Sequence, residues 1–138
     1  MRNLQRPGRS PVMASNAMIA TSHPLASQVG IDILKAGGNA VDAAIAACAT
    51  LCVVEPAMTG IGGDCFALYS PAGSTKPLAL NGSGRAPKAA SVDAIKAKGF
   101  DVIEVQSAHA VTIPGAIAAW TKLNNDHGSK PIQELLAP

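Results

Sequence analysis

The run NAVDAAIAACATLCVV, residues 39–54, is the most informative stretch of this sequence. Asn39 can accept hydrogen bonds from the free amide groups of a first helical turn, and Asp42 stands three residues later, as in a capping box. The residues that follow are apolar at almost every position until Pro56 closes the run. A helix that is apolar on all sides is normally buried in a core. The sequence therefore predicts a helix covered all round, whose alanines let neighbouring backbones approach closely.

A second helix is predicted just upstream, between Pro24 and the Gly37–Gly38 pair. Proline is tolerated in the first turn of a helix, and glycine commonly follows the last turn. An apolar residue recurs at every fourth position from Leu25 to Ile33, which makes one apolar face. Residues 18–22, MIATS, are predicted to form a short strand before this helix.

The remainder of the chain alternates between short strands and helices. The predicted elements are strands at 65–70 (CFALYS) and 76–81 (KPLALN), a capped helix at 91–99, a strand end at 109–115, a helix from Pro114 to about Asn125 and the start of another helix at 131–138. Two consecutive helices between strands do not make a simple parallel crossover, and they suit helices layered on an antiparallel or mixed sheet. The predicted fold class is therefore α+β.

The composition indicates one folded domain preceded by a basic tail. Hydrophobic residues make up 48% of the 138 residues and charged residues 14%, which excludes a disordered chain. The net charge of +2 depends on Arg2, Arg6 and Arg9, because the eight other basic side chains are outnumbered by nine acidic ones. Residues 1–12 are predicted to be a flexible basic tail and residues 13–138 to be the domain, with no nucleic-acid partner.

No segment has the pattern of an export signal or a membrane span. The basic start is followed by a segment that Ser15 and Asn16 interrupt, and the longest apolar run, residues 43–54, is too short to cross a bilayer. These features predict a cytoplasmic protein without a membrane partner. The chain stops soon after Leu135–Leu136, which favours a polypeptide that continues beyond Pro138.

The three cysteines, Cys48, Cys52 and Cys65, leave two interpretations open. An odd number of cysteines without an export signal argues against a disulfide framework. Cys48 and Cys52 share one helix face and could begin a metal site, but no further ligands have the spacing of such a site. Small apolar core residues are the favoured interpretation, because free cysteine is among the most buried residue types. No metal site is predicted.

Two glycine-rich stretches lie beside the predicted strands: TGIGGD, residues 59–64, and NGSGRAP, residues 81–87. Neither matches the order of strand, glycine motif and helix of a dinucleotide-binding site, and neither has P-loop spacing. Tight turns and close backbone approach are the favoured role of these glycines, and no cofactor is predicted. Arg85, in the second stretch, is either a solvated charge or is directed at an anion.

The residues contain no complete catalytic group. No nucleophile elbow is present, and His23, His109 and His127 have no serine or cysteine partner by motif. His23 is predicted to begin a helix and His127 to lie in a turn that ends one. Asp64 could be an acid or could cap a loop, and capping is the commoner role. No catalytic residue is predicted in this chain.

Four motifs together resemble one known family: GGNAVDAA at 37–44, GIGGD at 60–64, IPGAIAAW at 113–120 and ELLAP at 134–138. From Met18 to Pro138 the chain resembles the γ-glutamyltransferase (γ-glutamyltranspeptidase) family. The large subunit of that family opens with a similar strand, a helix ending in Gly-Gly, a GGNAVDAA helix and a glycine loop of GIGGGGF type.

The resemblance implies an N-terminal-nucleophile hydrolase fold, an αββα sandwich in which two stacked antiparallel sheets lie between helical layers. It implies a zymogen that cuts itself into a large and a small subunit, with the new N-terminal threonine of the small subunit as nucleophile and its own amine as base. Such an enzyme hydrolyses or transfers a γ-glutamyl or related acyl group from an amide such as glutathione. This chain corresponds to the front of the large subunit, so the small subunit is its expected partner and the chain alone is expected to be inactive.

The NGSGRAP turn departs from the family pattern. Glutamyl-specific enzymes have Arg-Glu-x-Ala-Pro here, and the resemblance implies that this arginine binds the α-carboxylate of the glutamyl group. Aligned on Ala86–Pro87, Ser83 takes the place of that arginine, Gly84 takes the place of the glutamate, and Arg85 lies two residues after Ser83. On an extended segment Ser83 and Arg85 face the same way, about 7 Å apart. Both are predicted substrate-binding residues, with a solvated Arg85 as the alternative.

Three functions remain open at this point. A γ-glutamyltransferase-like enzyme is favoured. The alternatives are an amidohydrolase or acylase of the same fold that takes a different acyl group, and a non-catalytic binding domain that lacks the nucleophile. A threonine at a downstream self-cleavage point distinguishes the enzymes from the binding domain.

Overall fold

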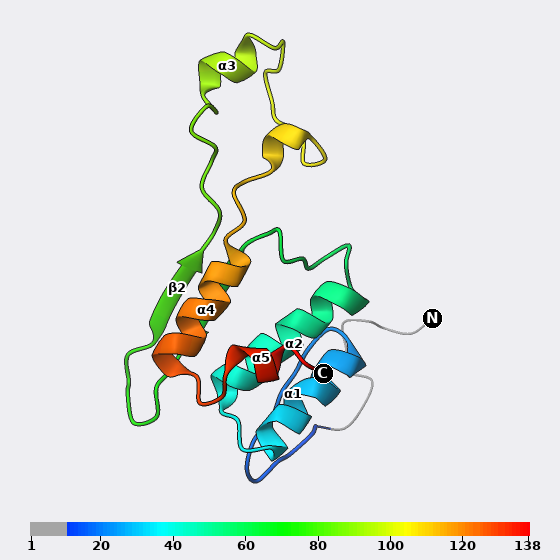
Figure 1. The fold of residues 1–138 in the computed structure, drawn as a ribbon, viewed down its shortest axis with the longest axis vertical. Helices are drawn as coiled ribbons and strands as arrows, with labels where there is room; N and C mark the ends of the chain where they lie inside the picture. Colours follow the sequence, from blue (N-terminus) through cyan, green and yellow to red (C-terminus); the bar gives the residue numbers. More distant parts are fainter. Residues whose placement is uncertain (1–10) are drawn as a thin grey trace.

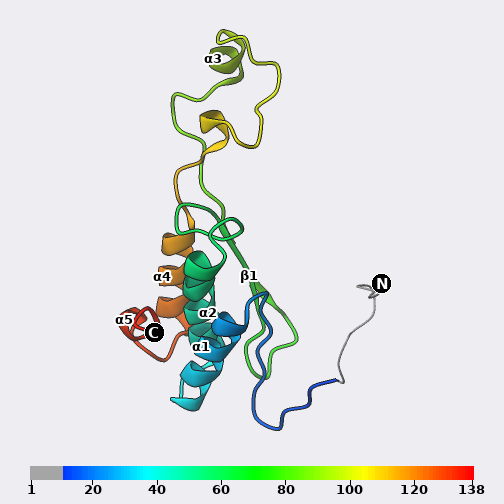
Figure 2. The same cartoon turned by 90° about the vertical axis from the view of Figure 1, so that its right-hand side faces the viewer.

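The computed structural model describes residues 11–138, which form a helical body and a long projection (Figures 1 and 2). Of the predicted basic tail at 1–12, residues 1–10 lie outside the described residues. The body contains α1 (Pro24–Lys35), α2 (Ala40–Val54), α4 (Ala116–His127), α5 (Ile132–Leu135) and the strands β1 (Cys65–Tyr69) and β2 (Leu78–Gly82). The projection contains α3 (Val92–Lys96) and the short 3₁₀ helix η1 (Ala108–Ala110). No helix among residues 11–138 is long and apolar enough to cross a membrane.

Helix α1 begins and ends where the sequence predicts. Pro24 occupies its first turn, and the Nδ1 atom of His23 accepts a hydrogen bond from a backbone N–H of that turn at 3.2 Å. Gly37 follows the helix with a φ of 85°, a left-handed conformation that favours glycine. The helix packs along α2, and a Cβ atom on Gly30 would lie 3.5 Å from the carbonyl oxygen of Ala43. That distance is an ordinary contact, whereas the same Cβ atom would collide with the Ile19 side chain, so Gly30 makes room for Ile19.

Helix α2 has the predicted capping box but is not covered on all sides. The Asn39 side chain accepts hydrogen bonds from the N–H groups of Val41 and Asp42, and the Asp42 carboxylate accepts one from the Asn39 N–H at 2.8 Å. The N-terminal half of the helix is largely buried, and the helix contacts α1, α4 and α5. Ala44 is exposed and Val53 is 79% exposed, so the prediction of all-round burial is wrong at these positions. The reason is that residues 11–138 provide neighbours for only part of the helix surface.

The two predicted strands pair as an antiparallel hairpin in which Cys65 lies opposite Gly82. Helix α4 packs against one face of this sheet, and a Cβ atom on Gly82 would collide with the Cβ of Ala119. The side chains of β1 alternate between partly buried and exposed. On the exposed face, Phe66 is 67% exposed and Leu68 is 81% exposed. One face of the sheet is therefore covered by described residues and the other is not.

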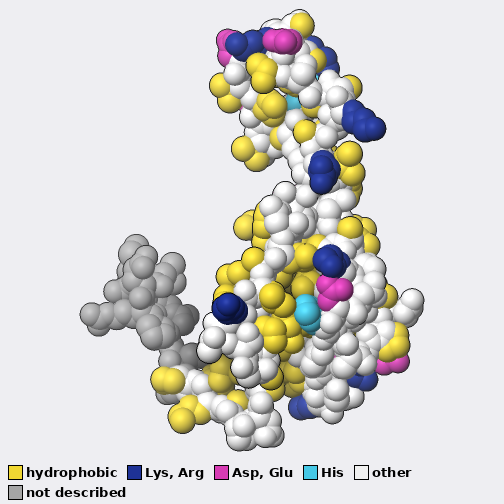
Figure 3. All heavy atoms as spheres, turned by 90° about the vertical axis from the view of Figure 1, so that its left-hand side faces the viewer, with side chains coloured by type: hydrophobic (Ala, Val, Ile, Leu, Met, Phe, Trp, Pro, Cys, Tyr) yellow, Lys and Arg dark blue, Asp and Glu magenta, His cyan; other side chains and the backbone are white. Residues whose placement is uncertain are grey.

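Exposed hydrophobic side chains also occur elsewhere on the molecule. Figure 3 shows them on the surface of both the body and the projection. On the projection, Val92 is 71% exposed and Val105 is 94% exposed. A folded domain normally exposes apolar residues singly, whereas apolar surface over several elements is typical of a face that another part or another molecule covers.

The core lies where α2, α4 and α5 meet. Ile45, Trp120 and Leu135 are buried there, and they form one hydrophobic cluster with Ile33 and Val41. Full burial of one such large side chain contributes about 1.5–3 kcal/mol. Because the sequence has few aromatic residues, aliphatic side chains and Trp120 provide most of this stabilisation.

Asp42 joins α2 to the turn between α4 and α5. Its carboxylate is fully buried and accepts hydrogen bonds from the N–H and hydroxyl groups of Ser129 and from the N–H of Lys130. The Asn39 side chain donates to the His127 carbonyl oxygen at 2.7 Å. Burial alone would raise the pKa of Asp42, but the hydrogen bonds outweigh burial and the pKa lies below its ordinary value. The capping box therefore also fixes a tertiary contact.

The later helices confirm their predicted positions with small shifts at the ends. The hydroxyl of Ser91 caps α3, and Gly99 follows that helix with a φ of 84°. Helix α4 starts at Ala116 and ends at His127, and α5 lies within the predicted range. Helix α3 ends at Lys96, three residues before the predicted end, while the other shifts are of one or two residues, which is usual at helix ends.

Two predicted strands are absent from the described part of the chain. Residues 18–22 belong to no strand, and residues 109–115 contain part of η1 followed by extended backbone. A strand requires a neighbouring backbone for its ladder of hydrogen bonds, and the sheet seen in residues 11–138 consists of β1 and β2. Ile113 makes a single such bond, from its N–H to the Arg85 carbonyl oxygen at 3.0 Å, which is too little for a strand.

Candidate functional site

Strand β2 runs directly into the turn that contains both predicted substrate-binding residues. The N–H of Ser83, just after the last strand residue Gly82, donates to the side-chain oxygen of Asn81 at 3.0 Å. Ser83 and Arg85 are exposed, whereas Gly84 between them is partly buried. The two predicted residues therefore flank a glycine on an accessible segment.

Gly84 packs tightly against the segment that leads into α4. A Cβ atom on Gly84 would collide with the Ile113 carbonyl oxygen and with the Thr112 side chain. Beside it, the Arg85 carbonyl oxygen accepts the hydrogen bond from Ile113. Successive side chains of an extended segment alternate in direction. If the segment is extended, Ser83 and Arg85 are expected on the side opposite Thr112.

The loop between α2 and β1 reaches the same place. The Gly63 carbonyl oxygen accepts hydrogen bonds from the N–H groups of Gly115 at 3.1 Å and Ala116 at 3.0 Å, at the start of α4. The Oδ1 atom of Asp64 accepts a hydrogen bond from the Gly84 N–H at 2.9 Å. Three segments meet here, and residues 63–64, 82–85 and 112–116 together are named the glycine junction.

The roles predicted for the glycines are confirmed within this junction and its loop. Gly84 has no room for a side chain, and a Cβ atom on Gly115 would collide with the Gly82 carbonyl oxygen. In the TGIGGD loop, the Gly63 N–H donates to the Gly60 carbonyl oxygen at 3.1 Å, which closes a tight turn. Close backbone approach thus explains Gly82, Gly84 and Gly115, whereas a Cβ atom on Gly60 or Gly62 would meet no described atom within 4 Å.

Asp64 has the favoured capping role, with one difference. The N–H group that it caps belongs to Gly84, twenty residues further along the chain, and not to its own loop. No sequence pattern relates these two positions, because neither is in a repeat or a helix where spacing determines proximity.

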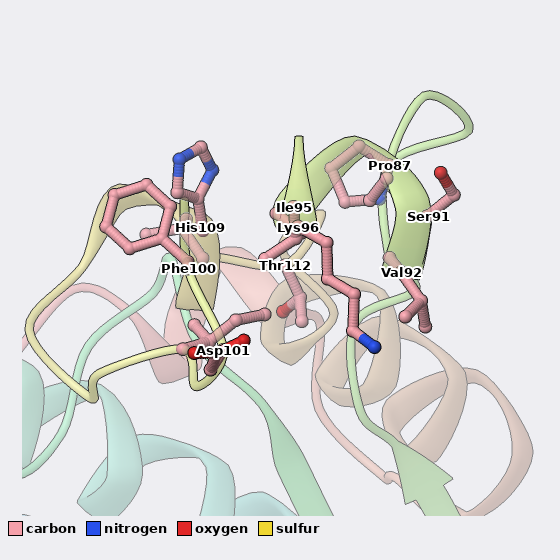
Figure 4. Close-up of a pocket in the computed structure, with 13 residues that line it drawn as sticks. Pro87, Ser91, Val92, Ile95, Lys96, Phe100, Asp101, His109 and Thr112 are labelled. Carbon is pink, nitrogen blue, oxygen red and sulfur yellow. The ribbon is translucent and has the colours of Figure 1, made fainter. Parts of the chain in front are cut away.

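An open pocket of about 400 Å³ lies just beyond the glycine junction, on the projection (Figure 4). Its lining is mainly apolar and comes from residues 86–112, with Lys96 as a cationic group and Asp101 as an acidic one. The rings of Phe100 and His109 meet edge to face with their centres 5.4 Å apart. This arrangement can contact an apolar group, but it contains no hydrogen-bonded nucleophile and base among the described residues.

The three histidines do not form a catalytic pair in residues 11–138. His23 caps α1 and His127 ends α4, as predicted, and the His127 ring lies 4.6 Å from the ring of Tyr69. The imidazole groups make no hydrogen bond to a Ser, Thr or Cys side chain in this part of the chain. The described residues therefore contain no hydrogen-bonded pair of a histidine and a nucleophile.

The cysteines lie against the hydrophobic core, which confirms the favoured interpretation. Burial raises the pKa of Cys48, Cys52 and Cys65, and the other two thiols raise the pKa of Cys48 further. A thiol with a raised pKa has less thiolate at neutral pH and is a poorer nucleophile and metal ligand. In residues 11–138, no group of three or more His, Cys, Asp or Glu side chains could hold a metal ion.

Comparison with known sequences identifies the family of this chain. The sequence model of the Gamma-glutamyltranspeptidase family matches residues 26–138. The chain belongs to the gamma-glutamyltranspeptidase family. A curated gamma-glutamyltranspeptidase relative, the Glutathione hydrolase-like YwrD proenzyme of Bacillus subtilis (strain 168), is 38% identical over 128 residues, which are 92% of this chain and 24% of the relative. The chain thus spans about a quarter of the length of such curated relatives.

Solved structures of gamma-glutamyltranspeptidase relatives confirm the predicted α+β, N-terminal-nucleophile hydrolase fold. Helicobacter pylori gamma-glutamyltranspeptidase superposes with a TM-score of 0.82 at 32% identity, covering 91% of this chain and 37% of that chain. Cephalosporin acylase from Bacillus halodurans gives a TM-score of 0.81 at 44% identity, covering 98% of this chain and 26% of that chain. These gamma-glutamyltranspeptidase-like relatives are enzymes by name, with more than one acyl specificity.

Proposed function

We propose that this chain is part of a proenzyme that hydrolyses a γ-glutamyl or related acyl group from an amide such as glutathione, or transfers it to an amine. The nucleophile is an N-terminal threonine, exposed by self-cleavage in a part of the protein outside this chain, and its own amine is the base. The names of the relatives support this proposal, because they describe a glutathione hydrolase-like proenzyme, a transpeptidase and an acylase.

The observation on which the proposal rests is the glycine junction. It holds Ser83 and Arg85 on an accessible segment, and in residues 11–138 the ion pairs are Lys122–Asp126 and Lys130–Glu134, so no described carboxylate pairs with Arg85. A guanidinium group forms a planar fork that suits carboxylates. In the proposed enzyme Arg85 binds an anionic part of the acyl group and Ser83 contributes a hydrogen bond.

An acylase for a non-glutamyl acyl group is the second candidate, and one observation favours it. Gly84 stands where the glutamyl-specific turn has glutamate, and the junction has no room for a side chain at that position. Ser83 likewise replaces the arginine of that turn. The 44% identity to cephalosporin acylase is consistent with this alternative.

Expression of the full-length protein tests the proposal. We expect a purified precursor to yield two polypeptides, of which the smaller begins with threonine, and to release 4-nitroaniline from acyl anilides. Comparing γ-glutamyl 4-nitroanilide with anilides of acyl groups that lack the α-amino acid function separates the two candidates. A precursor that stays intact and inactive identifies the non-catalytic binding domain instead.

A substitution tests the specificity assignment in the same protein. Ser83→Arg restores the arginine of the glutamyl-specific turn and is expected to increase the preference for γ-glutamyl substrates. Ser70→Arg, at an exposed position just after β1, is the matched control and should leave the preference unchanged. If Ser83→Arg and Ser70→Arg show the same preference for γ-glutamyl substrates, Ser83 does not contact the substrate.

A further inference from the structure

Asp64 is a charged residue to which the proposed function assigns no role. It is exposed, and its carboxylate accepts the Gly84 N–H in the middle of the segment that contains Ser83 and Arg85. The hydrogen bond therefore connects the loop before β1 with the turn after β2.

The backbone of that turn is fixed by three hydrogen bonds. The Ser83 N–H donates to Asn81 within the turn, the Gly84 N–H donates to Asp64, and the Arg85 carbonyl oxygen accepts from Ile113. Two of the three bonds come from other segments of the chain. Among the described residues, Asp64 is the acceptor for the central N–H of the turn.

Hydrogen bonds of the two neighbouring residues fix the backbone at Asp64. Its neighbour Gly63 accepts two hydrogen bonds from the start of α4, and its other neighbour, Cys65, pairs with Gly82 as the first residue of β1. A short side chain on a fixed backbone loses little rotamer freedom when it forms a hydrogen bond, so the bond costs little entropy.

Steric contact fixes the opposite side of the turn. Gly84 lies against Thr112 and Ile113 so closely that a Cβ atom would collide with both. Gly84 is thus held between the Asp64 carboxylate and the segment before α4. Removing the Asp64 carboxylate breaks the hydrogen bond to the Gly84 N–H. The contact of Gly84 with Thr112 and Ile113 remains.

We propose that Asp64 is a positioning residue, which acts through the Gly84 N–H to hold Ser83 and Arg85 in the conformation that binds the acyl group. The kinetic consequence rests on the proposed function. Without Asp64 the turn samples other conformations, and substrate binding then includes the cost of ordering it, which raises KM. The negative charge of Asp64 gives no attraction for an anionic acyl group, so the acceptor oxygen is the relevant feature.

Variants of the full-length protein separate the acceptor from the charge. Asp64→Ala removes the acceptor, Asp64→Ser replaces it with a hydroxyl that is too short to reach, and Asp64→Asn keeps an oxygen at the same place without the charge. We expect the first two to raise KM for an anionic acyl anilide about five- to tenfold with kcat within about twofold, and Asp64→Asn to stay within about twofold of wild type. Asp93→Ala, an exposed acidic position on α3, is the control.

A double variant shows whether Asp64 acts through the turn. In the Asp64→Ala, Arg85→Ala protein, KM should rise by less than the product of the two single effects, because Asp64 can no longer position Arg85 and only its effect through Ser83 remains. Additive effects of the two substitutions would contradict a positioning role, as would an Asp64→Asn variant as impaired as Asp64→Ala.

Hydrogen exchange provides a readout that does not require turnover. Mass spectrometry of a peptide spanning residues 81–90 should show faster deuterium uptake in Asp64→Ala than in wild type, and wild-type uptake in Asp64→Asn. If the wild-type protein neither cleaves itself nor hydrolyses amides, the proposed function fails, while this comparison still decides the positioning role. Unchanged uptake in Asp64→Ala and Asp64→Ser would overturn it.

Discussion

At the scale of single residues, Gly84 determines how closely the Ser83–Arg85 segment approaches α4. We expect Gly84→Ala to destabilise the full-length protein by about 1–3 kcal/mol, because its Cβ would overlap the Ile113 carbonyl and Thr112. Thermal unfolding measures the effect. Gly62→Ala is the control, since a Cβ atom there meets no described atom within 4 Å. Equal unfolding midpoints for Gly84→Ala and Gly62→Ala would show that the glycine junction has room for a side chain at residue 84.

Arg85 provides the residue-scale test of substrate binding. Loss of a hydrogen bond to a charged group costs about 1.5–3 kcal/mol, so Arg85→Ala should raise KM for an anionic substrate about ten- to a hundredfold, with self-cleavage intact. Steady-state kinetics of the full-length enzyme measure this change. Lys88→Ala, an exposed cation three residues later, is the control. An unchanged KM for every anionic substrate tested would make Arg85 a solvated turn residue.

Sequence reasoning reached some of these residues and missed others for a physical reason. Ser83 and Arg85 lie in a short motif that resembles a known turn, and their substrate-binding role stays a prediction. The contact between Asp64 and Gly84 could not be predicted, because it joins two loops whose proximity depends on the β1–β2 pairing. Local patterns predict local contacts, and a hydrogen bond between distant segments requires the tertiary fold.

At the scale of elements, the capping box of α2 was predicted from Asn39 and Asp42, whereas its tertiary contact with Ser129 was not. Helix starts have local signals in the sequence, which is why α1, α3 and α4 also lie close to their predicted ranges. A strand at residues 18–22 was predicted wrongly, since strand formation depends on a partner that a local pattern does not reveal.

Asp42 should be the most sensitive helix cap in the molecule. Asp42→Ala removes a fully buried acceptor of several hydrogen bonds and leaves the N–H and hydroxyl groups of Ser129 without that partner. We expect a loss of about 2–4 kcal/mol in the free energy of unfolding, measured by urea denaturation of the full-length protein. Asp93→Ala, in the first turn of the exposed helix α3, should cost less than about 1 kcal/mol. Similar losses in the two variants would contradict the described role.

The same carboxylate predicts a dependence of stability on pH. Its pKa in the folded protein is lowered from 3.8, so its contribution is fully present above about pH 4 and is lost as the pH falls through the folded value. The stability of the wild type should therefore decrease more steeply below about pH 4 than that of Asp42→Asn, which has no charge to lose. Urea denaturation at a series of pH values measures both slopes. If the free energy of unfolding of both proteins depended on pH in the same way, the pKa of Asp42 would not differ between the folded and unfolded states.

At the scale of the whole molecule, exposed apolar surface is the dominant feature (Figure 3). We expect the 138-residue polypeptide alone to bind a hydrophobic dye and to self-associate, since Phe66, Leu68 and Val53 are all more than half exposed. Dye fluorescence and light scattering measure this. A variant with Phe66→Ser and Leu68→Thr should bind less dye. A monomeric sample with a cooperative thermal transition and no dye binding would contradict the expectation.

The hydrogen bond between Arg85 and Ile113 has a consequence for evolution and engineering. It joins the two ends of residues 86–112, so the whole projection leaves and re-enters the body at one point (Figure 1). The entropy of closing a loop grows slowly with its length, by about 0.6 kcal/mol for each doubling. We therefore expect that the projection can be shortened, extended or replaced by another segment while β2 and α4 keep their places.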